Sequence, residues 1–395
     1  MGTVSAAVMT TERADSRLPH VLDRLRSLDP LVISDRGNPW MTARAAWSAA
    51  RPGVSHHLVV QDDVRIAPAL ASAVRDLAAG FPDKAFAFYA QWDTNSSYRV
   101  RMAAFGADPA VQASAREWVP AQALLLPKRV CDLVRAVPED FSPDDDEVLA
   151  MVLYYSEPGC EVGITVPNLV EHDDDPGLGY NSQHGLRRAA CFAGEELTWR
   201  TPPAMTWDGQ GWDEISVTLG PAGTRLDWGL RRAGRLRRYR QIHFPWRTAV
   251  PHCGLSPEHV AQISQDILNG SGAVPVTDAA EDDDPLPRAA LFEYTVACIL
   301  HGVAWRNWWR GGRPSSDLRR SKTADAALIA LWRSCRNLPL PADLLTSLGW
   351  DAVLAGTELG HAATQEEAHA RLTTWFCSTR WETSRPLWSD DARSD

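Results

Sequence analysis

The sequence contains very little lysine. Lys84, Lys128 and Lys322 are the only lysines among the 40 basic residues, and the others are arginine. An arginine bias of this kind indicates a GC-rich genome more than it indicates a function. Acidic residues still outnumber basic ones, so the formal net charge is −10 and the pI is about 5.6. Because proteins that bind nucleic acids non-specifically are usually basic, we do not expect nucleic acid as a partner.

The sequence also lacks a long apolar run. No segment approaches the length of about 18 apolar residues that a membrane-spanning helix needs. The first residues show no basic start followed by an apolar stretch, so we expect no signal peptide. Both absences predict a cytoplasmic protein without a membrane span.

Cysteine pairs with the spacing of redox or zinc motifs are missing as well. The seven cysteines are Cys131, Cys160, Cys191, Cys253, Cys298, Cys335 and Cys377. They are odd in number, scattered and without a CxxC pair, which excludes a disulfide framework or a zinc site of that kind. We expect buried, reduced thiols.

What the sequence does contain is ordinary globular material, with a first part that alternates between strands and helices. A chain of 395 residues with 45% hydrophobic residues can bury a large core and should form about two domains. Apolar runs predict strands over residues 3–10, 31–35, 56–63 and 84–90, and helical spacing of apolar residues predicts helices over 16–30, 38–53 and 68–82. Such alternation predicts an α/β protein with a doubly wound, mostly parallel sheet.

The later part of the sequence changes in character. A strand and a helix are expected over residues 121–138, an acidic helix start over 144–159, and a strand from residue 160 that leads into a Gly-rich loop. From residue 256 the apolar spacing is mainly helical. We therefore expect a first domain over residues 1–195, a connecting segment over 196–255 with short strands and a basic stretch, a helical domain over 256–385 and a disordered tail over 386–395.

The segment HHLVVQDDVRIAP (residues 56–68) ends its predicted strand on two adjacent carboxylates, Asp62 and Asp63. Aspartate is common where a chain leaves a sheet, because its side chain can bind nearby backbone groups. The same position at the C-terminal end of a parallel strand is also where open α/β sheets bind ligands. Mg²⁺ and Mn²⁺ prefer oxygen ligands and often bind through one or two carboxylates plus substrate phosphates. A divalent metal site is therefore the alternative to a plain strand exit.

Four motifs in residues 3–195 together resemble a bacterial nucleotide-sugar glycosyltransferase of the GT-A fold, a Rossmann-like, mostly parallel sheet with flanking helices. They are VVQDDV at the position of the DxD-type metal motif, GNPWMTARAAW as the preceding helix, DDDEVLAMVL as the acidic helix start and VPNLVEHDDD as the closing strand. Gln61 stands where a strict DxD motif has its first acidic residue.

The resemblance implies a metal-dependent glycosyltransferase with a nucleotide-sugar donor. Asp63 would bind Mn²⁺ or Mg²⁺ directly, Asp62 would assist or contact the ribose, and His172 would be a further ligand. Asp145 or Asp146 would be the base that activates an acceptor hydroxyl, which implies inversion at the sugar. The expected donor-binding residues are Thr10, Thr11, Arg13, Asp35, Arg44 and Asp62.

Several questions stay open at this point. A UDP-sugar is the first choice of donor and a hydroxyl on a saccharide or natural product the expected acceptor, while homodimer formation is undecided. Because Gln61 departs from the DxD motif, the alternative is a catalytically degraded GT-A protein that binds a nucleotide sugar or a partner without turnover. A phosphoryl-transfer enzyme is less well supported, because the GxxxxGK[ST] loop is missing. The basic stretch over residues 231–247 could bind the phosphate of an acceptor, an acidic peptide or nucleic acid, but a solvated basic face is the more frequent outcome.

Overall fold

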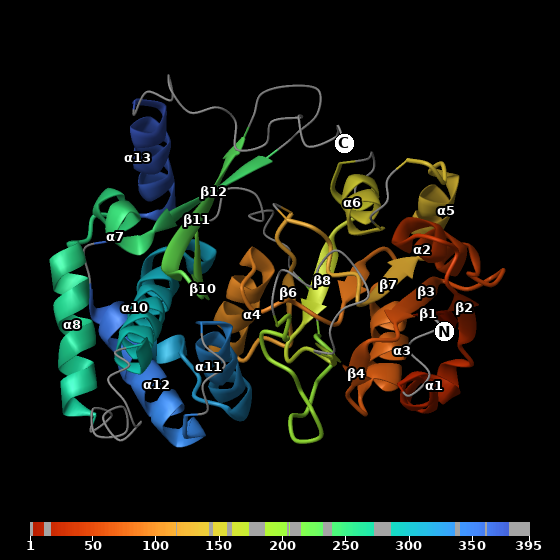
Figure 1. Ribbon diagram of the computed structural model, residues 1–395, viewed down its shortest axis with the longest axis horizontal. Helices are drawn as coiled ribbons and strands as arrows, with labels where there is room; N and C mark the ends of the chain where they lie inside the picture. Colours follow the sequence, from red (N-terminus) through yellow and green to blue (C-terminus); the bar gives the residue numbers. More distant parts are fainter. Residues whose placement is uncertain are drawn as a thin grey trace.

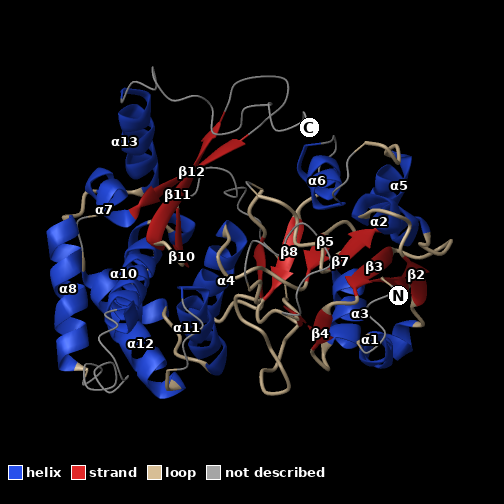
Figure 2. Ribbon diagram, viewed as in Figure 1, coloured by secondary structure: helices blue, strands red, loops and turns tan. Residues whose placement is uncertain are grey.

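The computed structural model shows a mixed α/β protein with a helical C-terminal region (Figures 1 and 2). It describes residues 3–11, 17–115, 117–141, 145–155, 160–173, 186–203, 205, 215–231, 239–271, 286–335, 340–359 and 362–378. Arg13, much of the basic stretch and the predicted tail over residues 386–395 lie outside these residues.

The N-terminal region is built on a seven-stranded sheet with the order β2-β1-β3-β7-β5-β8-β6. Its strands are β1 (Val4–Thr10), β2 (Leu31–Ser34), β3 (His56–Gln61), β5 (Ala85–Ala87), β6 (Ala110–Gln112), β7 (Ala123–Pro127) and β8 (Val162–Thr165). β7 and β6 pair antiparallel with their neighbours, and the other strands share one direction. The predicted α/β class with a mostly parallel sheet is confirmed.

Two smaller sheets accompany the large one. β4 (Val64–Ile66) pairs antiparallel with β9 (Val170–His172), and this pair lies beside the ends of the large sheet. β10 (Ser216–Gly220), β11 (Gly223–Arg231) and β12 (Tyr239–Pro245) form an antiparallel three-stranded sheet.

Helices cover both faces of the large sheet (Figure 1). The helices α1 (Leu18–Leu25) and α3 (Leu70–Gly80) lie on one face, and α2 (Pro39–Ser48), α5 (Lys128–Ala136) and α6 (Asp145–Ala150) lie on the other. Successive side chains of a strand point to opposite faces. Accordingly Ala6 and Val8 pack into the core beneath α1 and α3, whereas Ala7 packs into the core on the α2 side.

The helix α4 (Asn95–Phe105) had no counterpart among the expected elements. All of its residues are buried, including the basic Arg99 and Arg101, so it has no polar face and no amphipathic pattern. Thr94 caps its N-terminus, and both oxygens of Glu117 accept hydrogen bonds from its first backbone N–H groups. The helix contacts both the large sheet and the C-terminal helices, so it joins the two regions.

The C-terminal region is mainly helical, as expected from its apolar spacing. Its helices are α7 (Trp246–Ala249), α8 (Pro257–Gly270), α10 (Leu286–Asn307), α11 (Lys322–Cys335), α12 (Ala342–Glu358) and α13 (Gln365–Ser378). The described residues of both regions also include shorter helical turns: the 3-10 segments Arg26–Leu28, Val250–Cys253, Trp309–Gly311 and Ser315–Asp317, and a π-helical turn at Met151–Tyr155. One apolar cluster runs without interruption from Ala7 in β1 to Leu372 in α13, so the described regions share a core.

The described helices include none that combines the length and the apolar character needed to cross a bilayer. The six cysteines with described side chains are buried and carry no disulfide bond.

Candidate functional site

The candidate site forms where β1 and β3, which are parallel neighbours, reach their C-terminal ends at Thr10 and Gln61. Asp62 and Asp63 follow β3 directly and precede the short strand β4. β4 pairs with β9 in a register that sets Val64 opposite His172. This small sheet therefore brings His172 from a remote part of the sequence to the end of β3.

Asp63 and His172 are in direct contact. Oδ2 of Asp63 lies 3.2 Å from Nε2 of His172, and the His172 side chain is almost fully buried. Burial alone would raise the pKa of Asp63, but the contact with His172 and the charges of Arg187 and Arg17 outweigh it and lower that pKa below its usual value. The Asp63 carboxyl is therefore ionised at neutral pH.

Asp63 and His172 also carry polar atoms that have no hydrogen-bond partner among the described residues. Among the described residues, Oδ1 of Asp63 and Nδ1 of His172 are buried without a hydrogen-bond partner. Buried polar atoms are usually satisfied, so such atoms call for an explanation. A carboxylate oxygen beside an imidazole nitrogen is a donor set that suits Mn²⁺.

The pair supplies two of the ligands that a divalent metal would take. No cluster of three or more His, Cys, Asp or Glu side chains with metal-binding geometry occurs within the described part of the chain. The remaining positions would fall to water and substrate oxygens, an arrangement typical of ions that bind phosphates together with one or two carboxylates.

Asp62, although adjacent to Asp63, has a different partner. Its Oδ2 accepts a hydrogen bond of 2.9 Å from the backbone N–H of Thr11. Burial raises the pKa of Asp62 above its usual value, and its interactions with Thr10 and Thr11 oppose this shift only in part. Asp62 thus joins the ends of β3 and β1.

Thr10 and Thr11 lie at the end of β1, where donor contacts were expected. The Thr10 hydroxyl donates to the Thr11 carbonyl oxygen, and the buried Thr11 hydroxyl has no partner among the described residues. The structure therefore brings Thr10, Thr11, Asp62, Asp63 and His172 together at one edge of the sheet.

Two other predicted donor-binding residues are engaged elsewhere. Asp35 accepts hydrogen bonds from Gly37 N–H and the Thr42 hydroxyl and thereby fixes the turn before α2. The Arg44 guanidinium donates to the Val137 carbonyl oxygen and forms a 2.7 Å ion pair with Glu139, which ties α2 to the end of α5. Their roles in donor binding stay predictions.

Asp145 and Asp146 occupy the first turn of α6, as the acidic helix start predicted. Both are partly exposed, and α6 packs against α2. Carboxylates at this end of a helix are stabilised by the helix dipole, whatever else they do. Their role as the catalytic base stays a prediction.

Glu171 is a residue of the site that the sequence did not point out. Its buried carboxylate accepts hydrogen bonds from the backbone N–H groups of His172 and Ala189, at 3.0 and 2.6 Å. Burial raises its pKa to about 7. In the sequence, the only signal for Glu171 is that it directly precedes the candidate ligand His172 in the segment VEH. Its hydrogen-bond partner Ala189 is distant along the chain.

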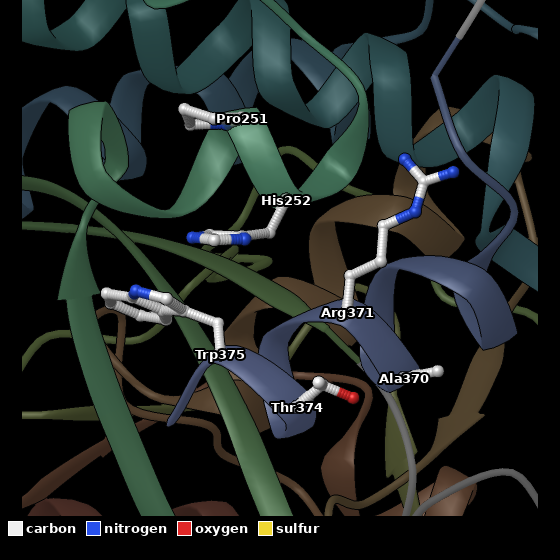
Figure 3. A pocket seen from close by; sticks show the side chains of 6 residues that line it. All are labelled: Pro251, His252, Ala370, Arg371, Thr374 and Trp375. Carbon is white, nitrogen blue, oxygen red and sulfur yellow. The ribbon is translucent and has the colours of Figure 1, made fainter. Parts of the chain in front are cut away.

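A separate pocket of about 470 Å³ lies in the C-terminal region (Figure 3). It lies between the Val250–Cys253 turn and α13, and the rings of His252 and Trp375 are stacked there with centroids 4.5 Å apart. None of the predicted site residues that the structure describes lines it.

The fold and the strand-end site define a mixed α/β protein with a candidate ligand-binding edge. Comparison with known protein families and with curated proteins finds no match to this chain.

Proposed function

We propose that the protein is a metal-dependent glycosyltransferase of the GT-A type that uses a nucleotide-sugar donor. The observation that carries the proposal is the contact between Asp63 and His172 at the C-terminal end of a parallel strand, with unused polar atoms on both side chains. Ligands of α/β sheets bind at such strand ends. The four motifs that resemble GT-A enzymes support the same reading.

Transfer of a sugar from a nucleotide requires that the departing diphosphate be neutralised. A divalent metal ion, when bound, supplies that neutralisation as a Lewis acid. Asp63 and His172 would hold the ion. Arg17 and Arg187, whose charges already act on Asp63, add positive potential at this edge.

The other residues of the edge would orient the nucleoside. Asp62 fixes the backbone at Thr11, and the Thr11 hydroxyl is available for a hydrogen bond to the ribose or base. Asp145 or Asp146 would accept the proton of the attacking hydroxyl, with inversion at the sugar carbon. We favour a UDP-sugar donor and a hydroxyl acceptor on a saccharide or natural product.

A turnover assay tests the proposal. Purified protein is incubated with a panel of UDP-, GDP-, TDP- and CDP-sugars, with Mn²⁺ or with chelator, and release of the nucleoside diphosphate is measured. We expect metal-dependent hydrolysis of one donor, reduced at least about 100-fold in Asp63→Asn and in His172→Gln. Asp266→Asn, on the exposed surface of α8, is the matched control and should keep full activity.

A second candidate function is a degraded GT-A protein that binds a nucleotide sugar without turnover. Gln61 at the first position of the QDD triplet favours it, since a glutamine cannot supply the negative charge of a DxD motif. Tight, metal-dependent binding of one donor without any hydrolysis would support this function. Hydrolysis that is unaffected by chelator and by Asp63→Asn would contradict both.

A further inference from the structure

A second cluster of charged side chains lies on the three-stranded sheet, away from the residues assigned above. Asp227 of β11 lies opposite His243 of β12 in the strand register. The Asp227 carboxylate is almost completely buried, and both of its oxygens have partners. Oδ2 accepts a hydrogen bond from the Thr218 hydroxyl at 2.8 Å, and Oδ1 lies 2.6 Å from Nδ1 of His243.

Arg225 joins the same cluster from two positions earlier in β11. Its Nε donates to the Thr218 hydroxyl at 3.0 Å and lies 3.7 Å from Oδ1 of Asp227. The Arg225 and His243 side chains therefore both approach Oδ1 of the buried Asp227 carboxylate. Asp227 holds them close together and fixes the orientation of each.

These contacts leave the outer ends of both side chains available. Nδ1 of His243 is used by Asp227, so Nε2 is the remaining ring nitrogen, and 46% of the His243 side chain is exposed. Arg225 is bound through Nε, and its two terminal nitrogens have no hydrogen-bond partner within the described residues. An arginine offers only donors, and Nε2 of a histidine is a donor when the ring is protonated. The buried carboxylate thus fixes two nitrogen-bearing groups whose outer ends remain available.

We propose that Arg225 and His243 form a binding site for a phosphate group, with Asp227 as the buried positioning residue. The guanidinium can donate two parallel hydrogen bonds to one edge of a phosphate. When the imidazole is protonated, Nε2–H of His243 adds a third donor from the neighbouring strand and from another direction. Three donors from two directions match a tetrahedral phosphate better than a planar carboxylate.

The site does not depend on the proposed glycosyl transfer. No metal ion is needed for it, and none of its residues belongs to the strand-end edge with Asp63 and His172. The ligand can be a free phosphorylated molecule or a phosphate on a lipid headgroup, because both expose the same monoester oxygens.

The test follows the side-chain nitrogens of His243 by NMR while inorganic phosphate is added to the full chain in the presence of chelator. The signal is assigned by its loss in His243→Gln. We expect a saturable shift with a dissociation constant on the order of 1 mM, and a much smaller shift with acetate at equal ionic strength. Asp63→Ala should leave the phosphate titration unchanged, which separates this site from the strand-end site.

Two arginine variants distinguish a specific phosphate-binding site from non-specific attraction of phosphate by nearby positive charges. Arg225→Gln should weaken phosphate binding about tenfold, the usual effect of losing a charge-assisted hydrogen bond. Arg247→Gln is the control: its guanidinium lies over the Trp246 ring at 4.3 Å, and its removal should change binding by less than about twofold. Equal weakening in both variants would overturn the proposal.

The titration of the unmodified protein is decisive even if Arg225→Gln does not fold. A His243 signal that responds to phosphate no more than to acetate would overturn the proposal. Titrations with glycerol 3-phosphate and with phosphatidylcholine vesicles containing phosphatidic acid then identify the source of the phosphate, and a stronger response to either one supports the site.

Discussion

Asp62 and Asp63 are adjacent in the sequence but experience opposite environments. Burial raises the pKa of Asp62, whereas His172 and two arginines bring the pKa of Asp63 below its usual value despite burial. A raised carboxyl pKa means that the ionised form is less favourable in the folded state than in the unfolded state. The Asp62 charge therefore costs stability at neutral pH, which is typical of residues kept for a function.

This difference predicts opposite effects of two conservative substitutions. Asp62→Asn removes the unfavourable charge and keeps an oxygen for Thr11 N–H, so we expect unfolding stability at pH 7 to stay the same or rise. Asp63→Asn removes a favourable interaction and should lower stability by about 1 kcal/mol. Urea unfolding in the presence of chelator measures both. An equal loss of stability in the two variants would contradict the assigned environments.

At the scale of elements, α10 and α12 cross at a point where only glycine fits. A Cβ atom on Gly302 would lie 2.0 Å from the Val353 carbonyl oxygen, and one on Gly356 would lie 2.0 Å from the Ile299 carbonyl oxygen. Both obstacles are backbone atoms, so the helices would have to move apart.

We expect Gly302→Ala to destabilise the protein by about 3 kcal/mol or more, because separating the helices breaks their packing. Gly270→Ala is the matched control at the end of α8, where an added Cβ meets nothing within 4 Å. It should be neutral or slightly stabilising, given the better helix propensity of alanine. Thermal unfolding of both variants measures the difference, and similar melting temperatures would contradict the close crossing.

The elements that the sequence predicted are those with a clear apolar pattern. β1, β3, α1 and α3 correspond to runs or periodic spacings that are visible in the sequence. α4 was missed because every one of its residues is buried and no periodicity distinguishes one face. β4 and β9 were missed as a pair because three residues are too few for a pattern.

The parts of the site that could be predicted are those with a local signal in the sequence. Asp62 and Asp63 stand out because they end an apolar strand, whereas His172 was found only through the resemblance. Arg44 was expected near the diphosphate from its position on a helix, but that position cannot reveal its partners Val137 and Glu139. Contacts between distant segments, such as Ala189 with Glu171, leave no local signal.

At the scale of the whole molecule, the continuous core buries two neutral histidines in different regions. His57 in β3 is hydrogen-bonded to Ser5 and to the Ala46 carbonyl oxygen, and burial lowers its pKa to about 4. His301 in α10 donates Nδ1–H to the Ala297 carbonyl oxygen, and burial lowers its pKa to about 3. The folded state thus resists proton uptake at both positions.

This resistance predicts a loss of stability in acid. The unfolded chain takes up protons on these histidines below about pH 6.5, while the folded chain does not until about pH 4. Each histidine should therefore reduce stability by about 2 kcal/mol between pH 7 and pH 5. Glu171 acts in the opposite direction, because its raised pKa favours the folded state as the pH falls.

A variant isolates the histidine contribution from that of Glu171. In His301→Leu, the stability lost between pH 7 and pH 5 should be about 2 kcal/mol smaller than in the unmodified protein. Urea unfolding at the two pH values measures this difference, in which the contribution of Glu171 cancels. The same acid loss in both proteins would show that His301 is protonated in the folded state.

The most direct test of the proposed donor site is calorimetry of nucleotide-sugar binding with Mn²⁺ and with chelator. We expect one nucleotide class to bind in Mn²⁺, and we expect both chelator and Asp63→Ala to abolish this binding. If no nucleotide sugar binds under any condition, the donor site is contradicted, and Asp62 and Asp63 are residues at which the chain merely leaves the sheet.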